Sequence, residues 1–314
     1  MERHTTMIDQ AIIQRYIGAS CANRNEKSKN NLAVLLAKFF SLSPCSSLDD
    51  LTRQDLIQML AESSIMSMNT FDSFKSKIKG FIAWLCDNGH CSEALLVSWQ
   101  SIRFSDIDRS DFYDRFYFKD YSELCDTIQG VFGEVSSEYD TFKSAATLVW
   151  FGIDIKDLPN ILKDDLHETA GYIIAPATKR KIYLPKAAIK QLESYKNADA
   201  FVSAKFGGCT VPYAESQYLF RSYKNEQFTV AQLTNISAAA NRVAADCGKA
   251  FQWNRIYLSG LYKRLLDTEN QFGEIGKTNY DKLRVFFGES LSKQILSQKY
   301  KEYQAYREYM YSRY

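Results

Sequence analysis

The sequence has few of the residues that interrupt regular structure, with 14 glycines and 5 prolines among 314 residues. This scarcity argues against long disordered stretches and against β-solenoids. No apolar run approaches the ~20 residues that a membrane-spanning helix needs, and no apolar run of the signal-peptide kind follows the first residues. We therefore expect a cytoplasmic protein, whose length suggests two folded domains.

Neither sign of charge dominates, since 39 Lys and Arg face 37 Asp and Glu. This balance excludes a histone-like basic protein and an acidic tail protein. Only three histidines are present, and the seven cysteines form no Cys-x-x-Cys pair, as is typical of a reducing cytoplasm. The one mixed cluster, Cys86 with His90 and Cys91, offers fewer than the four ligands of a structural zinc. We expect no metal and no cofactor.

Motifs of common nucleotide-dependent and hydrolytic enzymes are also missing. The sequence has no G-x-x-x-x-G-K-[ST], no G-x-G-x-x-G and no G-x-S-x-G segment. Aromatic residues are abundant instead, with 20 Phe, 20 Tyr and 4 Trp. Six tyrosines lie within residues 300–314, and they favour a terminal helix over residues 291–314 that packs through its rings.

The first third of the chain is expected to be helical, over residues 7–19, 31–40, 52–61 and 70–88. The last segment is the clearest, because apolar residues recur in it every three or four positions and Gly89 follows as a stop. Lys75 and Lys79 lie four residues apart and share one face, while Lys77 points elsewhere. That face is either simply solvated or contacts phosphates.

A charged, aromatic stretch without clear periodicity covers residues 103–119 and places the domain boundary at residue 118. Helices are then expected over residues 121–132, 141–151, 185–195, 229–248 and 254–266. Two short strands, 172–175 and 181–184, are joined by Pro176–Arg180 into a hairpin with a basic tip. The sequence thus predicts a mainly α fold with a small β-hairpin or sheet.

One segment of the second part is similar to a known family. The apolar residues 145–151 run into Gly152–Leu158, which reads GIDIKDL, and Asp165-Leu166 follows. This frame resembles the tyrosine recombinases, or phage integrases, whose catalytic domain opens with an apolar helix, G-[LI]-R-x-x-E-L and a D-[LI] pair. The resemblance places Asp154 at the family's first catalytic arginine.

Two further segments follow in the order of the family's motifs. The hairpin segment Lys179–Pro185, KRKIYLP, resembles K-x-R-x-[IV]-x-[LI]-P, so the family lysine corresponds to Lys179 or Lys181. The segment Asn254–Ser259, NRIYLS, resembles H-x-L-R-H-[ST]. In that frame Asn254 takes the place of the histidine and Tyr257 that of the second arginine.

The last family motif is found before the C-terminal helix. Phe287–Leu291, FGESL, resembles L-G-H-S-S, so Glu289 replaces the histidine. The family's nucleophilic tyrosine falls nine residues later, where this chain has Gln298, with Tyr300 and Tyr303 just beyond.

The resemblance implies a tyrosine-recombinase-like fold, with a helical, SAM-like core-binding domain in residues 1–118 and a catalytic-type domain in residues 119–314. Family catalysis attacks a DNA phosphodiester with tyrosine, and Arg, His and Lys donors stabilise the charge of the transition state. Losing one such donor costs roughly 2.7–4 kcal/mol. With Asp154, Asn254, Tyr257 and Glu289 at four of these positions, the chain is not expected to be an enzyme.

DNA binding does not need those four positions, because lysines and arginines elsewhere supply the contacts to phosphates. Replacing Lys179, Arg180 and Lys181 at the hairpin tip should weaken DNA binding, unless the hairpin is merely a solvated turn. Arg264 has an alternative partner in Asp267 on the same helix. The candidate DNA-binding residues are Lys75, Lys77, Lys79, Lys179, Arg180, Lys181, Arg255, Lys263 and Arg264.

An integrase-like fold that has lost its chemistry predicts a sequence-specific protein of double-stranded DNA, a phage transcriptional repressor that acts on operator sites in the cytoplasm of a bacterial host. It resembles the integrase-like repressors that maintain lysogeny in SPβ-type phages of Bacillus. One alternative is an active, divergent tyrosine recombinase with Tyr300 or Tyr303 as its nucleophile. Another is an all-α interaction protein that does not bind DNA. A regulatory protein partner and the oligomeric state are left open.

Overall fold

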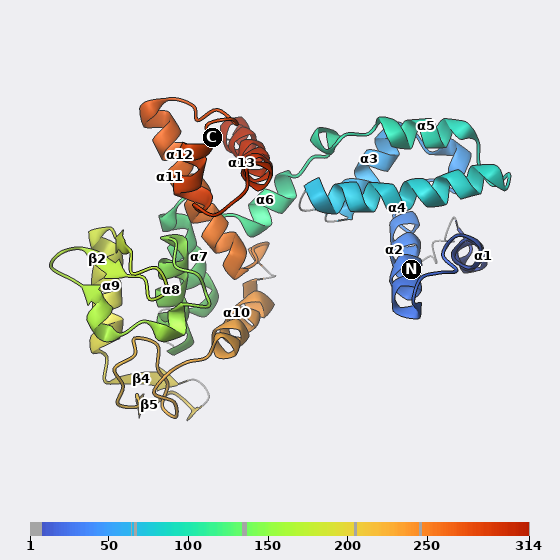
Figure 1. Cartoon of the computed structure of the whole chain (residues 1–314). Helices are drawn as coiled ribbons and strands as arrows, with labels where there is room; N and C mark the ends of the chain where they lie inside the picture. Colours follow the sequence, from blue (N-terminus) through green and yellow to red (C-terminus); the bar gives the residue numbers. More distant parts are fainter. Residues whose placement is uncertain are drawn as a thin grey trace. The chain divides into compact units, whose positions relative to one another are not determined.

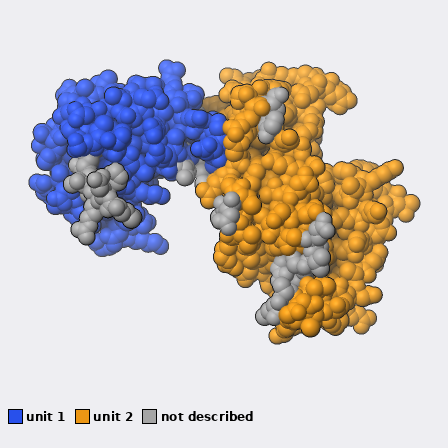
Figure 2. All heavy atoms as spheres, turned by 180° about the vertical axis from the view of Figure 1, so that it is seen from behind, with its two compact units in different colours: residues 1–112 blue, residues 113–314 orange. Residues whose placement is uncertain are grey.

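The computed structural model describes residues 8–313 except 64, 66–67, 134–136, 204–205 and 245–246. The chain forms two compact units, Met1–Phe112 and Tyr113–Tyr314 (Figures 1 and 2). Helices dominate both units, and two small antiparallel sheets lie in the second. The prediction of a mainly α fold with a small sheet is therefore confirmed.

The N-terminal unit is built from helices and two short 3₁₀ turns. Its elements are α1 (Gln10–Ser20), α2 (Glu26–Phe40), η1 (Leu48–Asp50), α3 (Arg53–Glu62), α4 (Met68–Asp87), α5 (Glu93–Ser101) and η2 (Phe104–Asp106). The helix predicted over residues 70–88 is α4. Its apolar stripe is buried, with Ile78, Phe81, Ile82 and Leu85 fully inaccessible, so its amphipathic pattern alone indicated the buried face.

Local hydrogen bonds set the ends of these helices. The side chains of Asp9 and Asn25 accept backbone N–H groups at the starts of α1 and α2, and Thr52 forms a capping box with Asp55 at the start of α3. Gly89 stops α4 with a φ of 70°, a left-handed conformation that glycine adopts without steric cost.

The C-terminal unit surrounds one central helix, α8 (Ser137–Trp150). Helices α7 (Tyr121–Phe132), α9 (Lys186–Asn197), α10 (Val230–Ala244) and α11 (Trp253–Phe272) pack against it (Figure 1). The face of α8 with Phe142, Ala145, Ala146 and Leu148 is fully buried in the core. The remaining helical elements of this unit are η3 (Leu158–Asn160), η4 (Lys163–Asp165), α12 (Tyr280–Phe287) and α13 (Lys293–Arg313), while α6 (Ser110–Phe116) includes residues of both units.

Helices α8 and α11 approach each other closely at Gly260. A Cβ atom on this glycine would lie 2.0 Å from the carbonyl oxygen of Trp150, far inside van der Waals contact. Only glycine allows the two backbones to come this near. This contact fixes the end of α8 against the middle of α11.

The first sheet is three-stranded and antiparallel, in the order β1 (Leu166–His167), β2 (Tyr172–Ile174) and β3 (Lys181–Tyr183). Its β2–β3 pair is the predicted hairpin, with Ile174 opposite Lys181. Ile182 points into the core while Lys181 and Tyr183 are exposed, the alternation of a strand covered on one side. A second hairpin, β4 (Ala200–Ser203) with β5 (Cys209–Pro212), was not predicted.

The two units divide between Phe112 and Tyr113, a few residues before the boundary predicted at residue 118. The rings of Tyr113 and Tyr117 pack against Tyr306 on α13, and Tyr117 also stacks on Tyr262 of α11. These aromatic contacts pack the second part of the charged and aromatic stretch, from Tyr113 onward, within the C-terminal unit. Among the described helices, we find none with the length and apolar character needed to cross a bilayer.

Candidate DNA-binding surface

The turn after α8 holds the segment that resembles the family's first catalytic box. Gly152 adopts a φ of 106°, Ile153 is buried, and Asp154 is exposed. The carboxylate of Asp154 accepts the backbone N–H of Lys156 at 2.9 Å and so closes its own turn. The position at which the family has a cation is therefore held by an exposed anion.

Arg264, on α11, lies beside this turn. Its guanidinium donates to the carbonyl oxygen of Trp150 at 2.6 Å, and a Cβ atom on Gly152 would lie 3.4 Å from it. Burial, together with the charge of Arg180, lowers the pKa of Arg264 to about 10, although Tyr257 acts in the opposite direction. The structure thus brings the hairpin, α11 and the end of α8 together around one half-buried cation, which stays charged at neutral pH.

The tip of the β2–β3 hairpin presents its cations to solvent. Lys179, Arg180 and Lys181 are all exposed, and we call these three side chains the hairpin cations. The tip is closed by two backbone hydrogen bonds, from Lys179 N–H to Ala175 at 2.8 Å and from Ala175 N–H to Arg180 at 3.0 Å. The ammonium of Lys181 lies 4.5 Å from the ring centre of Tyr172, a cation–π contact that orients it.

Positive charge continues from the hairpin into α9, which starts directly after it. Lys186 and Lys190 are exposed and lie four residues apart, so they share one face of the helix. Phosphate groups of DNA favour such closely spaced exposed cations.

The cations of α11 have internal partners. Arg255 donates to the hydroxyl of Tyr117 at 2.7 Å and is half-buried. Lys263 pairs with Asp267 at 2.6 Å. The alternative pairing of Arg264 with Asp267 is wrong, because Lys263 holds that carboxylate while Arg264 holds the carbonyl of Trp150.

In the N-terminal unit, the three lysines of α4 differ. The ammonium of Lys75 donates to the carbonyls of Gln100 and Ile102 at the end of α5, and burial lowers its pKa. Lys77 and Lys79 are exposed. The predicted common face of Lys75 and Lys79 is therefore divided between a half-buried structural contact and solvent.

The two tyrosines considered as nucleophiles are packed inside the C-terminal unit. Tyr300 and Tyr303 are both fully buried. The hydroxyl of Tyr303 donates to Glu269 at 2.6 Å and that of Tyr300 to Glu274 at 3.3 Å. Burial, reinforced by these carboxylates, raises the pKa of Tyr300 to about 12 and that of Tyr303 further. A phenol in this setting resists the deprotonation that attack on a phosphate requires.

The sequence did not indicate the network that holds α13 in place. Glu269, on α11, is buried and accepts hydrogen bonds from Tyr303, from Arg307 at 2.9 Å and from the backbone N–H of Ile275 at 2.9 Å. Its partners lie up to 38 residues away, so no local pattern points to it. Glycine inside a helix, as at Gly260, is the one local sign of the close α8–α11 contact.

The other residues at family positions are accessible. Asn254 is exposed near the start of α11, and Glu289 is exposed between α12 and α13. Tyr257 is half-buried. In the part of the chain that the structure describes, no three His, Cys, Asp or Glu side chains gather as metal ligands would. His90 instead packs on Trp84, with ring centres 6.0 Å apart.

No family model and no curated protein matches this chain. Solved structures do match. They include the Tn1549 transposon integrase in complex with a circular intermediate DNA, at 14% identity over 93% of this chain and 94% of that one, with a TM-score of 0.40. A lambda integrase dimer bound to a COC′ core site matches at 16% identity over 92% and 94%, with a TM-score of 0.35. The integrase from mycobacterium phage Brujita matches at 10% identity over 94% and 89%, with a TM-score of 0.37.

Proposed function

We propose that this protein binds specific sites on double-stranded DNA without recombining it, and that it acts as a transcriptional repressor that maintains phage lysogeny in the cytoplasm of a bacterial cell. One observation carries the proposal. Arg180, one of the exposed hairpin cations, lies near the half-buried Arg264, while an exposed carboxylate, Asp154, stands where a recombinase would neutralise the phosphate.

The lack of catalysis follows from electrostatics. A transferring phosphoryl group gains negative charge, and the family stabilises it with fixed donors. Asp154 and Glu289 are anions at two of these positions. At about 5 Å and an effective dielectric constant of about 20, each would repel a phosphate by roughly 3 kcal/mol. The missing donors and the added repulsion both raise the barrier to attack on the phosphate. The buried tyrosines of α13 offer no accessible replacement nucleophile.

DNA binding is favoured by the same geometry. The hairpin cations and the exposed lysines of α9 can replace condensed counterions on the phosphate backbone. The formal net charge of the whole chain is only +2, so non-specific attraction is weak. A protein of this kind depends on contacts with base edges for its affinity, which suits a selective operator-binding protein.

Genome-wide selection tests the proposal. Fragments of a phage genome in which the chain is encoded are mixed with the purified protein at 150 mM salt, and bound fragments are sequenced. We expect a few sites to bind at least about 10³-fold more tightly than random DNA. If no fragment binds more tightly than random DNA, the chain is not a specific DNA-binding protein.

A suicide substrate separates a repressor from a recombinase. Nicked DNA that traps a phosphotyrosyl intermediate should leave the wild-type chain unlabelled. A covalent adduct that disappears in Tyr300→Phe or Tyr303→Phe would establish an active recombinase instead.

A further inference from the structure

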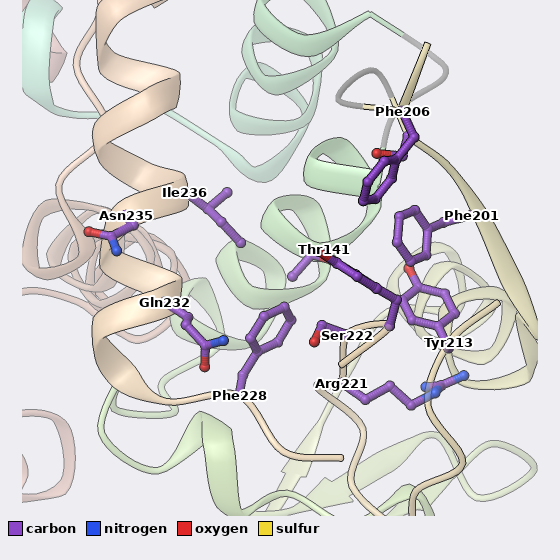
Figure 3. Close-up of a pocket in the computed structure, with 12 residues that line it drawn as sticks. Thr141, Phe201, Phe206, Tyr213, Arg221, Ser222, Phe228, Gln232, Asn235 and Ile236 are labelled. Atoms are coloured by element: carbon purple, nitrogen blue, oxygen red, sulfur yellow. The ribbon is translucent and has the colours of Figure 1, made fainter. Parts of the chain in front are cut away.

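A cavity of about 260 Å³ opens between α10 and the β4–β5 hairpin of the C-terminal unit (Figure 3). It is separate from the hairpin cations and from Arg264, none of which lines it. Its size is slightly below the range of roughly 300–1,000 Å³ typical of small-molecule sites. A ligand of one or two fused rings fits such a volume.

One wall of the cavity is aromatic. Figure 3 shows Phe201, Phe206 and Tyr213 facing α10 across the space. The ring centres of Phe201 and Tyr213 are 4.7 Å apart, and Phe206 meets Tyr223 edge-on at 5.4 Å. Rings arranged in this way offer flat faces on which a planar ligand can stack.

The opposite wall comes from α10 and the residues just before it, and it combines apolar and amide side chains. Phe228 and Ile236 supply the apolar surface, and Gln232 and Asn235 supply the amides (Figure 3). The carbonyl oxygen of Gln232 caps α10 by accepting from Thr229, which leaves its NH₂ group as a donor. The side chain of Asn235 is exposed and lines the cavity, and no hydrogen bond joins it to another described residue, so both its donor and its acceptor are available.

The charge of the lining restricts the ligand further. Arg221 is the one charged side chain among the described residues that line the cavity, and it is 2% exposed. Its guanidinium lies 4.7 Å from the ring centre of Tyr213 and donates to the carbonyls of Lys196, Ala198 and Leu219. The cation is thus turned toward the backbone, and its charge repels organic cations. Since none of these lining residues carries a carboxylate, the cavity favours a neutral ligand over a cation.

We propose that this cavity binds a small, neutral, planar nitrogen heteroaromatic of purine size. The ring stacks on Phe201 and Tyr213, and its polar edge exchanges hydrogen bonds with the amides of Gln232 and Asn235. Carboxamides pair with such edges because they offer a donor and an acceptor side by side. This inference concerns a small molecule and does not depend on whether the protein represses transcription.

Adenine is the probe for the test, titrated against the full chain by calorimetry and by ligand-observed NMR. We expect one site per chain with a dissociation constant of about 0.1–1 mM, as for other ligands of about ten non-hydrogen atoms. Benzyltrimethylammonium, a planar ring with a fixed positive charge, should bind at least tenfold more weakly. Failure of adenine to saturate the protein at 5 mM, or tighter binding of the cation, overturns the proposal.

Variants of α10 locate the site. Ile236→Trp fills the cavity and should abolish adenine binding, while Val243→Trp, at an exposed position of the same helix outside the lining, should not change it. Asn235→Leu should weaken adenine at least fivefold and leave indole, which lacks a matching polar edge, unchanged. If Ile236→Trp is unfolded by circular dichroism, Phe206→Ala replaces it, since that ring is 41% exposed and can be removed without opening the core. Equal adenine affinity in the lining variants and the control would refute the site.

Discussion

The hairpin cations and the cations of α11 both look like basic clusters in the sequence. In the structure, the hairpin cations are exposed, whereas the cations of α11 bind other groups of the protein. Lys179, Arg180 and Lys181 are exposed at a hairpin tip. Arg255, Lys263 and Arg264 are bound to Tyr117, Asp267 and Trp150. A basic residue therefore predicts a DNA contact only where its side chain stays exposed to solvent. The difference separates two kinds of variant: those that change affinity for DNA and those that change stability.

The largest effect is expected where α11 meets α8. Gly260→Ala places a methyl group against the carbonyl of Trp150 and forces the helices apart. We expect a loss of more than about 3 kcal/mol of unfolding free energy and a fall in Tm of about 10 °C, measured by calorimetry. Gly130→Ala is the matched control, because that helical glycine has open space around its Cβ position and should be neutral or slightly stabilising. Equal Tm values for the two variants would show that the helices adjust.

Arg264→Met should have the next largest effect, because it removes a charge-assisted hydrogen bond and leaves the carbonyl of Trp150 without this donor. We expect a loss of about 2–3 kcal/mol in urea unfolding. Lys181→Met, at an exposed position, should stay within about 0.5 kcal/mol of wild type. If Arg264→Met instead weakened DNA binding at unchanged stability, Arg264 would belong with the hairpin cations.

Replacing Lys179, Arg180 and Lys181 with alanine should leave Tm nearly unchanged and weaken DNA binding. The slope of log affinity against log salt should fall by about 0.9 for each phosphate that the protein no longer neutralises. Fluorescence anisotropy titrations of any DNA duplex between 50 and 300 mM salt measure this slope. An unchanged slope would make the hairpin a solvated turn, and the difference from α11 would then have no functional meaning.

The smallest effect concerns pH and the tyrosines of α13. The pKa of Tyr300 is raised to about 12, so the folded state binds this proton more tightly than the unfolded chain does. The resulting stabilisation is complete below pH 10 and is lost as the pH rises from about 10 to 12. Tyr300→Phe should flatten the alkaline part of the stability profile and leave DNA binding intact. A defect in DNA binding or repression in this variant would contradict a purely structural role of Tyr300 and would support the alternative in which it is a nucleophile.

Features governed by neighbouring residues were predictable from the sequence. The helix α4, its stop at Gly89 and the β2–β3 hairpin all depend on periodicity or on turn chemistry within a few residues. The surroundings of the candidate site residues were not predictable. Lys75 binds carbonyls up to 27 residues away, and Arg255 binds a phenol 138 residues away. A single sequence does not show which distant group folding brings to a cation, so exposed and engaged lysines look the same.

The unpredicted β4–β5 hairpin illustrates the same limit. Its strands of four residues carry no strong alternation, and the pairing of Phe201 with Val211 joins them across a loop that contains Gly207 and Gly208. The formation of such short strands depends more on packing against the neighbouring helix than on the β-propensity of their own residues. The cavity beneath them therefore could not be predicted from the sequence alone.

Lys179 places backbone strain at the tip of the hairpin. It has a φ of 54°, a left-handed conformation that costs a residue with a side chain about 1 kcal/mol and costs glycine almost nothing. A single substitution to glycine would therefore make the tip more stable and less charged. The lysine at this position thus adds positive charge to the tip at the expense of backbone strain.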